Sequence, residues 1–229
     1  MKKSVTPWAF IPTLYLAEGL PYIIINAVST VLYADLGFEN TQIAFWTGWL
    51  YLPWILKMFW SPLVDARGTK RRWLLGAQLG MAVLFLALAL LCAVNAFSFA
   101  AQQNNLTFFT LSLFGFLAGA FISATFDFSS HGYFLVALTP VEQSKFVGIR
   151  TIFYRLAMIL GSGALVSAVG LLRPSLSGAL NWGALFAFLG LVFAAATAYH
   201  YRFLPRPAGD KPAHAAGGPA WGQAFGSYF

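Results

Sequence analysis

Six ionisable side chains lie inside long apolar stretches, where a charge is costly: Glu18, Lys57, Asp127, His131, Arg150 and Arg155. A charge at the centre of a bilayer costs at least about 2.5 kcal/mol on insertion scales, so such groups usually face a polar cavity or one another. The bases could bind an anionic solute, and an acid could take up and release a proton. This chemistry belongs to a transport pathway.

The depth of these groups decides which of them most need a cavity. Counted from the expected cytoplasmic helix ends, Glu18, Asp127 and Arg155 lie ~13–17 Å deep, and Lys57, His131 and Arg150 lie roughly 6–11 Å deep. For Lys57 and Arg150, structural ion pairs or snorkelling to the surface explain the sequence as well as a cavity does. For Glu18 and Arg155, the depth favours a polar cavity.

Asp127 and His131 lie four residues apart and therefore on the same face of a helix. A carboxylate beside an imidazole in a low-dielectric environment is suited to proton transfer. A simple hydrogen-bonded pair explains the same spacing, and the sequence leaves both interpretations open.

The composition indicates that lipid surrounds the elements that carry these groups. The chain of 229 residues is 59% hydrophobic and 9% charged, against about 25% charged in a typical soluble domain. We therefore predict an integral membrane protein. The net charge of +7 does not indicate nucleic-acid binding, because the cations form no patch with interleaved aromatic residues. The single cysteine, Cys92, excludes a disulfide within the chain and a thiolate metal site, and we expect no cofactor or metal.

Six apolar runs approach the length of about 20 residues that a transmembrane helix needs. They cover approximately residues 8–30, 42–62, 73–95, 107–137, 147–171 and 179–201. The predicted fold is an all-α membrane protein, with a six-helix transmembrane bundle over residues 1–204 and a cytoplasmic linker or tail over residues 205–229. Pro21 should kink the first helix close to Glu18, and the fourth run is long enough to tilt or to extend beyond the membrane.

The distribution of Lys and Arg predicts the orientation. If the amino terminus is cytoplasmic, nearly all loop cations fall on the cytoplasmic side: Lys2, Lys3, Arg67, Lys70, Arg71, Arg72, Lys145, Arg202, Arg206 and Lys211. Arg173 alone falls on the opposite side. The positive-inside rule then predicts that both ends of the chain are cytoplasmic.

The charged loop between the second and third runs reads Ser-Pro-Leu-Val-Asp-Ala-Arg-Gly-Thr-Lys-Arg-Arg over residues 61–72. It resembles the signature loop between the second and third helices of major facilitator transporters. The match includes Asp65, Gly68 and Lys70, while Ser61, Ala66 and Thr69 depart from the usual pattern. The resemblance implies a conformational latch that engages helix ends of a second half-bundle. Its expected residues are Asp65, Arg67, Gly68, Lys70 and Arg71.

Four longer strings sharpen the resemblance: Pro7–Tyr22, Thr47–Trp54 with the following Lys57, Ser123–Asp127 and Phe146–Ala157. They look like the AmpG-type muropeptide permeases, in the group that also holds acetyl-coenzyme A transporters. The resemblance implies a proton-coupled importer of anhydromuropeptides in the bacterial inner membrane, used in cell-wall recycling. It also implies that helices one and four line the cavity, and that a carboxy-terminal half-bundle completes it. His131 stands where such sequences often carry a second acid.

The same residues also allow other interpretations of the function. An acetyl-coenzyme A or peptide transporter of the same group, a non-transporting scaffold and a truncated half-transporter all fit the composition. An intramembrane serine protease would need a glycine two residues before Ser162, where Leu160 stands, and a histidine in a later span than that of Ser162. We therefore do not expect an enzyme.

Overall fold

The computed structural model describes residues 6–97, 106–172 and 178–212, and every regular element within these ranges is helical. Five helical segments there are long and apolar enough to cross a membrane: Pro7–Asp35, Lys70–Phe97, Leu106–Ala137, Pro140–Leu172 and Gly178–Phe203. The predicted all-α membrane fold is confirmed, but the predicted count of six spans is not, because the second run is not among these five.

Two of the five segments contain a π-helical turn. The first comprises α1 (Ile11–Ile23), a π turn at Ile24–Val28 and α2 (Ser29–Asp35), after a short 3-10 turn at Pro7–Ala9. The fourth comprises α8 (Pro140–Ile159), a π turn at Leu160–Leu165 and α9 (Val166–Leu172). The other three are the single helices α6 (Lys70–Phe97), α7 (Leu106–Ala137) and α10 (Gly178–Phe203).

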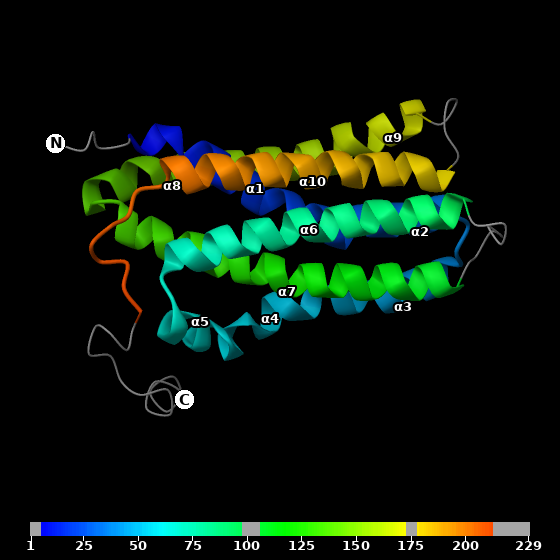
Figure 1. The fold of residues 1–229 in the computed structure, drawn as a ribbon, viewed down its shortest axis with the longest axis horizontal. Coiled ribbons are helices and arrows are strands. Elements are labelled where there is room, and N and C mark those ends of the chain that lie inside the picture. The colour runs from blue at the N-terminus through cyan, green and yellow to red at the C-terminus, as the bar shows by residue number, and fades with distance from the viewer. Residues whose placement is uncertain (1–5, 98–105, 173–177, 213–229) are drawn as a thin grey trace.

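The second run is broken into short helices. It consists of α3 (Asn40–Gly48), α4 (Leu52–Leu56) and α5 (Ser61–Arg67), with 3-10 turns at Trp49–Tyr51 and Lys57–Phe59. Pro53 and Pro62 lie in the first turns of α4 and α5, and the backbone donors that they lack would otherwise continue the preceding helix. The three pieces still follow one another along the length of the bundle (Figure 1).

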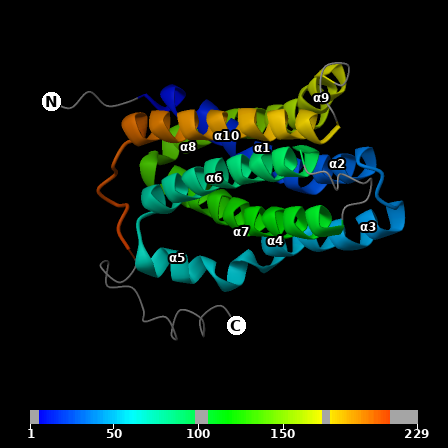
Figure 2. The ribbon, with the colours of Figure 1, turned by 45° about the vertical axis from the view of Figure 1, so that its right-hand side comes forward.

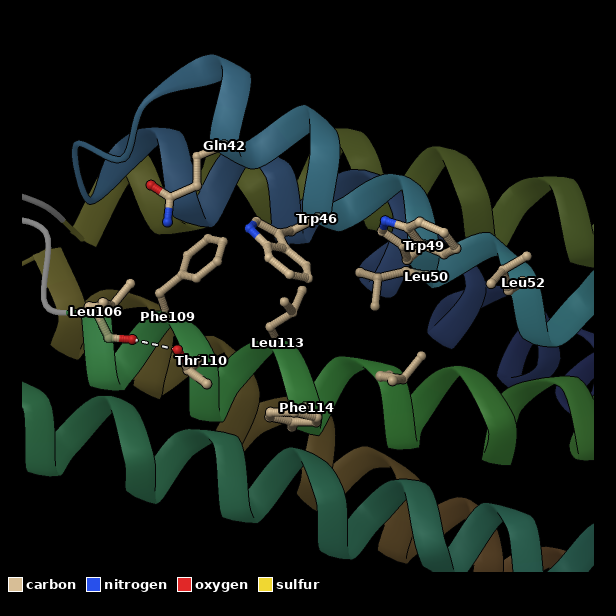
Figure 3. Close-up of a pocket in the computed structure, with 11 residues that line it drawn as sticks. Gln42, Trp46, Trp49, Leu50, Leu52, Leu106, Phe109, Thr110, Leu113 and Phe114 are labelled. Carbon is tan, nitrogen blue, oxygen red and sulfur yellow. Dashed lines mark hydrogen bonds between the residues drawn. The ribbon is translucent and has the colours of Figure 1, made fainter.

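An apolar cavity of about 510 Å³ lies between this broken segment and α7. Figure 3 shows Trp46 and Trp49 from the α3–α4 segment facing Leu113 and Phe109 of α7. Polar side chains in its wall are few, namely Gln42 and Thr110. The cavity therefore lacks the charges that an ionic solute would require.

Two helices begin earlier than the sequence indicated, because side chains cap them. Before α8, the Thr139 hydroxyl accepts a bond from the Glu142 backbone N–H at 3.4 Å, and a Glu142 carboxylate oxygen accepts one from the Thr139 N–H at 2.9 Å. Polar residues that were predicted to form a loop before residue 147 are therefore the first turns of α8. At α6, Asp210 supplies the capping carboxylate.

The helices pack around α1, which contacts α8, α7 and α10, while α6 lies between α10 and α7 (Figure 2). At Gly19 of α1, an added Cβ would lie 2.7 Å from the Tyr154 carbonyl oxygen and 2.8 Å from the Cβ of Ala157. Only a glycine permits α8 to approach so closely. This contact fixes α8 beside Glu18, which precedes Gly19.

The described cations outside the helix interiors share one end of the bundle. This end holds the α5–α6 connection, the α7–α8 turn and the last turn of α10, on the left in Figure 1. The cations are Arg67, Lys70, Arg71, Arg72, Lys145, Arg202, Arg206 and Lys211, whereas Asp35 and Glu39 lie at the opposite end. The positive-inside rule predicts that the first end is cytoplasmic.

Candidate functional site

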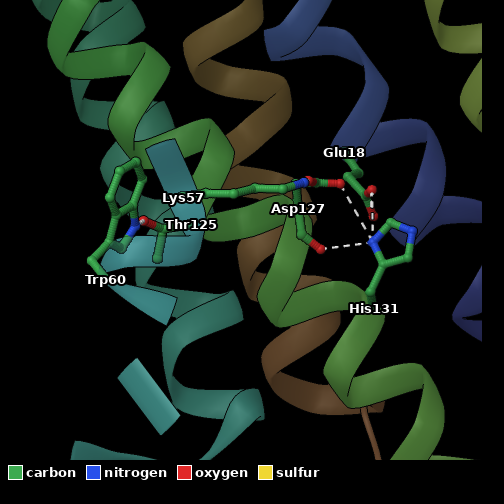
Figure 4. A network of polar contacts seen from close by, with 6 residues as sticks. All are labelled: Glu18, Lys57, Trp60, Thr125, Asp127 and His131. Carbon is green, nitrogen blue, oxygen red and sulfur yellow. Dashed lines mark hydrogen bonds and ion pairs between the residues drawn. The ribbon is translucent and has the colours of Figure 1, made fainter. Parts of the chain in front are cut away.

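A polar cluster lies where α1, α7 and α8 meet the 3-10 turn at Lys57–Phe59 (Figure 4). Its cavity of about 260 Å³ is lined by Tyr15, Glu18, Asp127, His131, Arg150, Thr151 and Tyr154. Lys57 reaches it through Asp127. Of the six ionisable residues singled out in the sequence, five therefore come together.

Lys57 and Asp127 form an ion pair between the ammonium group and Oδ2 of the carboxylate. Their side chains are 37% and 17% exposed. Beside the pair, the Trp60 indole N–H donates to the Thr125 hydroxyl at 3.2 Å, which further attaches the broken segment to α7 (Figure 4). Lys57 therefore has a partner and does not need to snorkel to the surface.

His131 touches both acids through one ring nitrogen. Its Nδ1 lies 2.8 Å from the Asp127 backbone oxygen, 3.4 Å from Asp127 Oδ1 and 3.5 Å from Glu18 Oε1. The carbonyl can only accept, so Nδ1 carries the hydrogen in that contact. The imidazole thus lies between the acid of α7 and that of α1, and the nitrogen that carries the hydrogen is near both carboxyl groups.

Glu18 is the most deeply buried of the acids and bases in the cluster, with a side chain that is 1% exposed. Neither of its carboxylate oxygens accepts a hydrogen bond from any described residue. A buried polar group without such a partner is rare in folded proteins. Glu18 lies in the wall of the cavity.

Arg150 lies above two aromatic rings and faces the same cavity. Its guanidinium carbon is 5.8 Å from the centroid of Tyr15 and 4.8 Å from that of Phe134. No described acid lies within ion-pair distance of Arg150. The rings hold the guanidinium by cation–π attraction and leave its hydrogen-bond donors available to an anion.

Arg155 lies outside this cavity and its side chain is exposed, so its place in the solute pathway stays a prediction. Tyr154 and Ala157 are the α8 residues that meet α1 at Gly19. Five residues along a helix rotate a side chain by about 140°, so Arg150 and Arg155 cannot share a face. In the sequence, only the depth of Arg155 within its apolar run favoured a place for it in the polar cavity. Tyr15 and Tyr154 were missed, and only their spacing from Glu18 and Arg150 in the sequence could have indicated them.

The predicted latch residues form contacts within this chain. Lys70 pairs with Asp65 across the α5–α6 connection. Arg71 donates to backbone oxygens of Tyr201 and Leu204 at the end of α10, at 2.6 and 3.3 Å. A Cβ on Gly68 would lie 2.7 Å from Nε1 of Trp73. Arg67 is exposed. Engagement of a second half-bundle stays a prediction.

Glu18, Asp127 and His131 present ligand atoms within 4.8 Å of one another, a spacing that could hold a cation. Lys57 already neutralises Asp127, and Arg150 adds a second positive charge to the same wall. Two neighbouring cations oppose the binding of a divalent metal ion. The cluster suits a proton and an anionic solute better.

Comparison with known proteins identifies relatives of this arrangement. The family model described as Major Facilitator Superfamily matches residues 13–229. Proteins named "Putative transporter AmpG 4" from Rickettsia felis and Rickettsia conorii are each 25% identical to the chain over 193 residues, which is 80% of this chain and 42% of the relative. The chain therefore spans less than half the length of these relatives. No solved structure matches it significantly.

Proposed function

Because the chain belongs to the Major Facilitator Superfamily, we propose that it forms one half of a secondary active transporter that imports an anionic solute together with protons. The family resemblance inferred from the sequence is confirmed. The resemblance to AmpG-type muropeptide permeases, whose name the relatives carry, supports anhydromuropeptide as the solute of this proposal, taken up across a bacterial inner membrane.

Arg150 is the observation that carries this proposal. It is a cation without an ion-pair partner among the described residues, it is held in place by Tyr15 and Phe134, and it faces a polar cavity. A carboxylate of the solute would bind the Arg150 guanidinium through paired hydrogen bonds. Lys57 pairs with Asp127 in the same region, so that the Asp127 charge does not oppose the binding of an anion at Arg150.

Proton coupling is assigned to the two acids and His131. Asp127 forms an ion pair with Lys57, whereas Glu18 has no hydrogen-bond donor among the described residues. In this proposal Glu18 takes up and releases the proton, and His131, whose Nδ1–H lies near both acids, stabilises the carboxylate that remains when the proton leaves. The proton gradient is the driving force and no cofactor is used.

The proposed transporter needs a second half-bundle, from the same gene or from a separate chain. Alternating access in this class of transporter is a rocking of two bundles around a shared central site. The latch residues 65–71 would contact that second bundle when the cavity is closed on the cytoplasmic side.

Uptake of radiolabelled anhydromuropeptide by a strain without its own permease tests the proposal. The strain should carry the native gene together with the DNA downstream of the Phe229 codon. We expect accumulation that a protonophore abolishes. Uptake no greater than with an empty vector, from a correctly inserted protein, would reject the solute assignment. Accumulation that survives the protonophore would reject proton coupling.

A further inference from the structure

A second polar cavity lies at the charged end of the bundle, apart from the Glu18 cluster. It has a volume of about 330 Å³ and is lined by Thr69, Arg71, Arg72, Arg206, Pro207 and Asp210. The segment that follows α10 forms one wall, and the first turn of α6 forms the other.

Asp210 and Arg71 hold these two walls together. The Asp210 carboxylate accepts hydrogen bonds from the backbone N–H groups of Lys70 and Arg71, at 2.7 and 3.0 Å. Arg71 in turn donates to the last carbonyl groups of α10. Both side chains are therefore used within the fold: Asp210 caps the amino end of one helix, and Arg71 caps the carboxyl end of another.

Arg72 and Arg206 have no such role. Both side chains are exposed, and neither lies within ion-pair distance of a described acid. Asp210, the acid in the cavity wall, is bound to the helix amino end and pairs with neither of them. Two uncompensated guanidinium groups thus border one cavity of a size that accepts a small anion.

We propose that this cavity binds the phosphate of an anionic phospholipid from the cytoplasmic leaflet. A guanidinium binds phosphate oxygens through paired hydrogen bonds, and basic pockets between helix ends on the cytoplasmic side bind acidic head groups. Tyr201 is 64% exposed and its ring lies 5.6 Å from the guanidinium of Arg71. An exposed aromatic residue at a helix end is typical of the head-group layer, which favours a lipid over a free anion.

Binding can be measured on the purified chain in detergent, by the rise in unfolding temperature on titration with phosphatidylglycerol, phosphatidylcholine or inorganic phosphate. We expect phosphatidylglycerol to stabilise the protein and the other two to have little effect. The double variant Arg72→Gln/Arg206→Gln should bind phosphatidylglycerol roughly thirtyfold more weakly, because the hydrogen bonds from both guanidinium groups to the phosphate, about 1 kcal/mol for each group, are lost. Lys145→Gln/Arg202→Gln removes the same charge from exposed positions at the same end and should bind normally.

Three outcomes would overturn the proposal. One is equal stabilisation by phosphatidylglycerol and phosphatidylcholine, and another is an equal loss of binding in the two double variants. The third is stabilisation by inorganic phosphate that matches the lipid, which would show a site for free anions. Because the replaced side chains are exposed, the variants should unfold without lipid at the same temperature as the wild type. This measurement verifies that they fold. The transport assay is not involved, so this site and the proposed function fail independently.

Discussion

The ammonium group of Lys57 pairs with Oδ2 of Asp127, residues that are seventy positions apart in the chain. This contact attaches the broken helical segment to α7 at the level of the polar cluster (Figure 4). It leaves Glu18 as the acid of the cluster without a hydrogen-bond donor among the described residues. The ion pair therefore distinguishes the carboxyl group of Asp127 from that of Glu18, which the sequence alone could not do.

The first prediction concerns this pair. Lys57→Met should lower the unfolding free energy by about 1–2 kcal/mol, since it leaves the partly buried Asp127 without its cation. Adding Asp127→Asn should recover part of that loss, with a coupling energy of about 1 kcal/mol in a double-mutant cycle. Chemical unfolding in detergent gives the unfolding free energies of the wild type, the two single variants and the double variant. Strictly additive effects would show that the ion pair contributes nothing to the fold.

The second prediction compares two arginines of α8. Arg150→Gln should raise the KM for uptake about thirtyfold, because a charge-assisted contact with the solute, typically worth about 2 kcal/mol, is lost. Arg155→Gln is the matched control, and its side chain lies outside the cavity. We expect its KM to change less than threefold, a change of about 0.6 kcal/mol. The reverse order of effects would identify Arg155 as the solute-binding residue.

The third prediction isolates proton coupling. Glu18→Gln keeps the shape of the side chain and removes its ability to carry a proton at any physiological pH. We expect accumulation against a gradient to be lost, while exchange of external for internal solute continues. Exchange assays in proteoliposomes with labelled anhydromuropeptide separate the two activities. Full accumulation by Glu18→Gln would assign the proton to another group.

The fourth prediction concerns the α1–α8 contact. Gly19→Ala places a Cβ 2.7 Å from the Tyr154 carbonyl oxygen, so the helices must separate. A loss of about 1–3 kcal/mol in stability should follow, as for other overpacked positions. Gly148→Ala on the same α8 meets nothing within 4 Å and should be neutral or slightly stabilising, because alanine favours helices. Thermal unfolding compares the two, and equal effects would contradict the close approach.

The apolar runs predicted most of the fold because lipid imposes a simple rule on length and composition. The run over 42–62 shows the limit of that rule. Pro53 and Lys57 lie within it, and its helix is interrupted near both residues. Hydropathy averaged over a window does not register where a backbone donor is missing.

The candidate site was predicted in its residue types but not in its geometry. A charge in lipid is costly, and a charged residue within an apolar run is visible in any sequence. This reasoning identified Glu18, Lys57, Asp127 and His131. The choice between Arg150 and Arg155 depends on which face of α8 meets Gly19, and helix rotation is not encoded by depth. His200 illustrates the same limit. Its ring contacts Thr13 and Gln78 on two other helices, at 3.0 and 2.8 Å, and no spacing along the chain indicates these partners.

In the proposed transporter, the cluster of acids and bases faces water and not lipid. Cysteine accessibility tests it most directly, with the buried Cys92 first replaced by Ala. Arg150→Cys should react with a membrane-impermeant maleimide, and anhydromuropeptide should slow that reaction. Val83→Cys, on the exposed apolar face of α6, should stay unlabelled. An Arg150→Cys variant as unreactive as Val83→Cys would contradict the account.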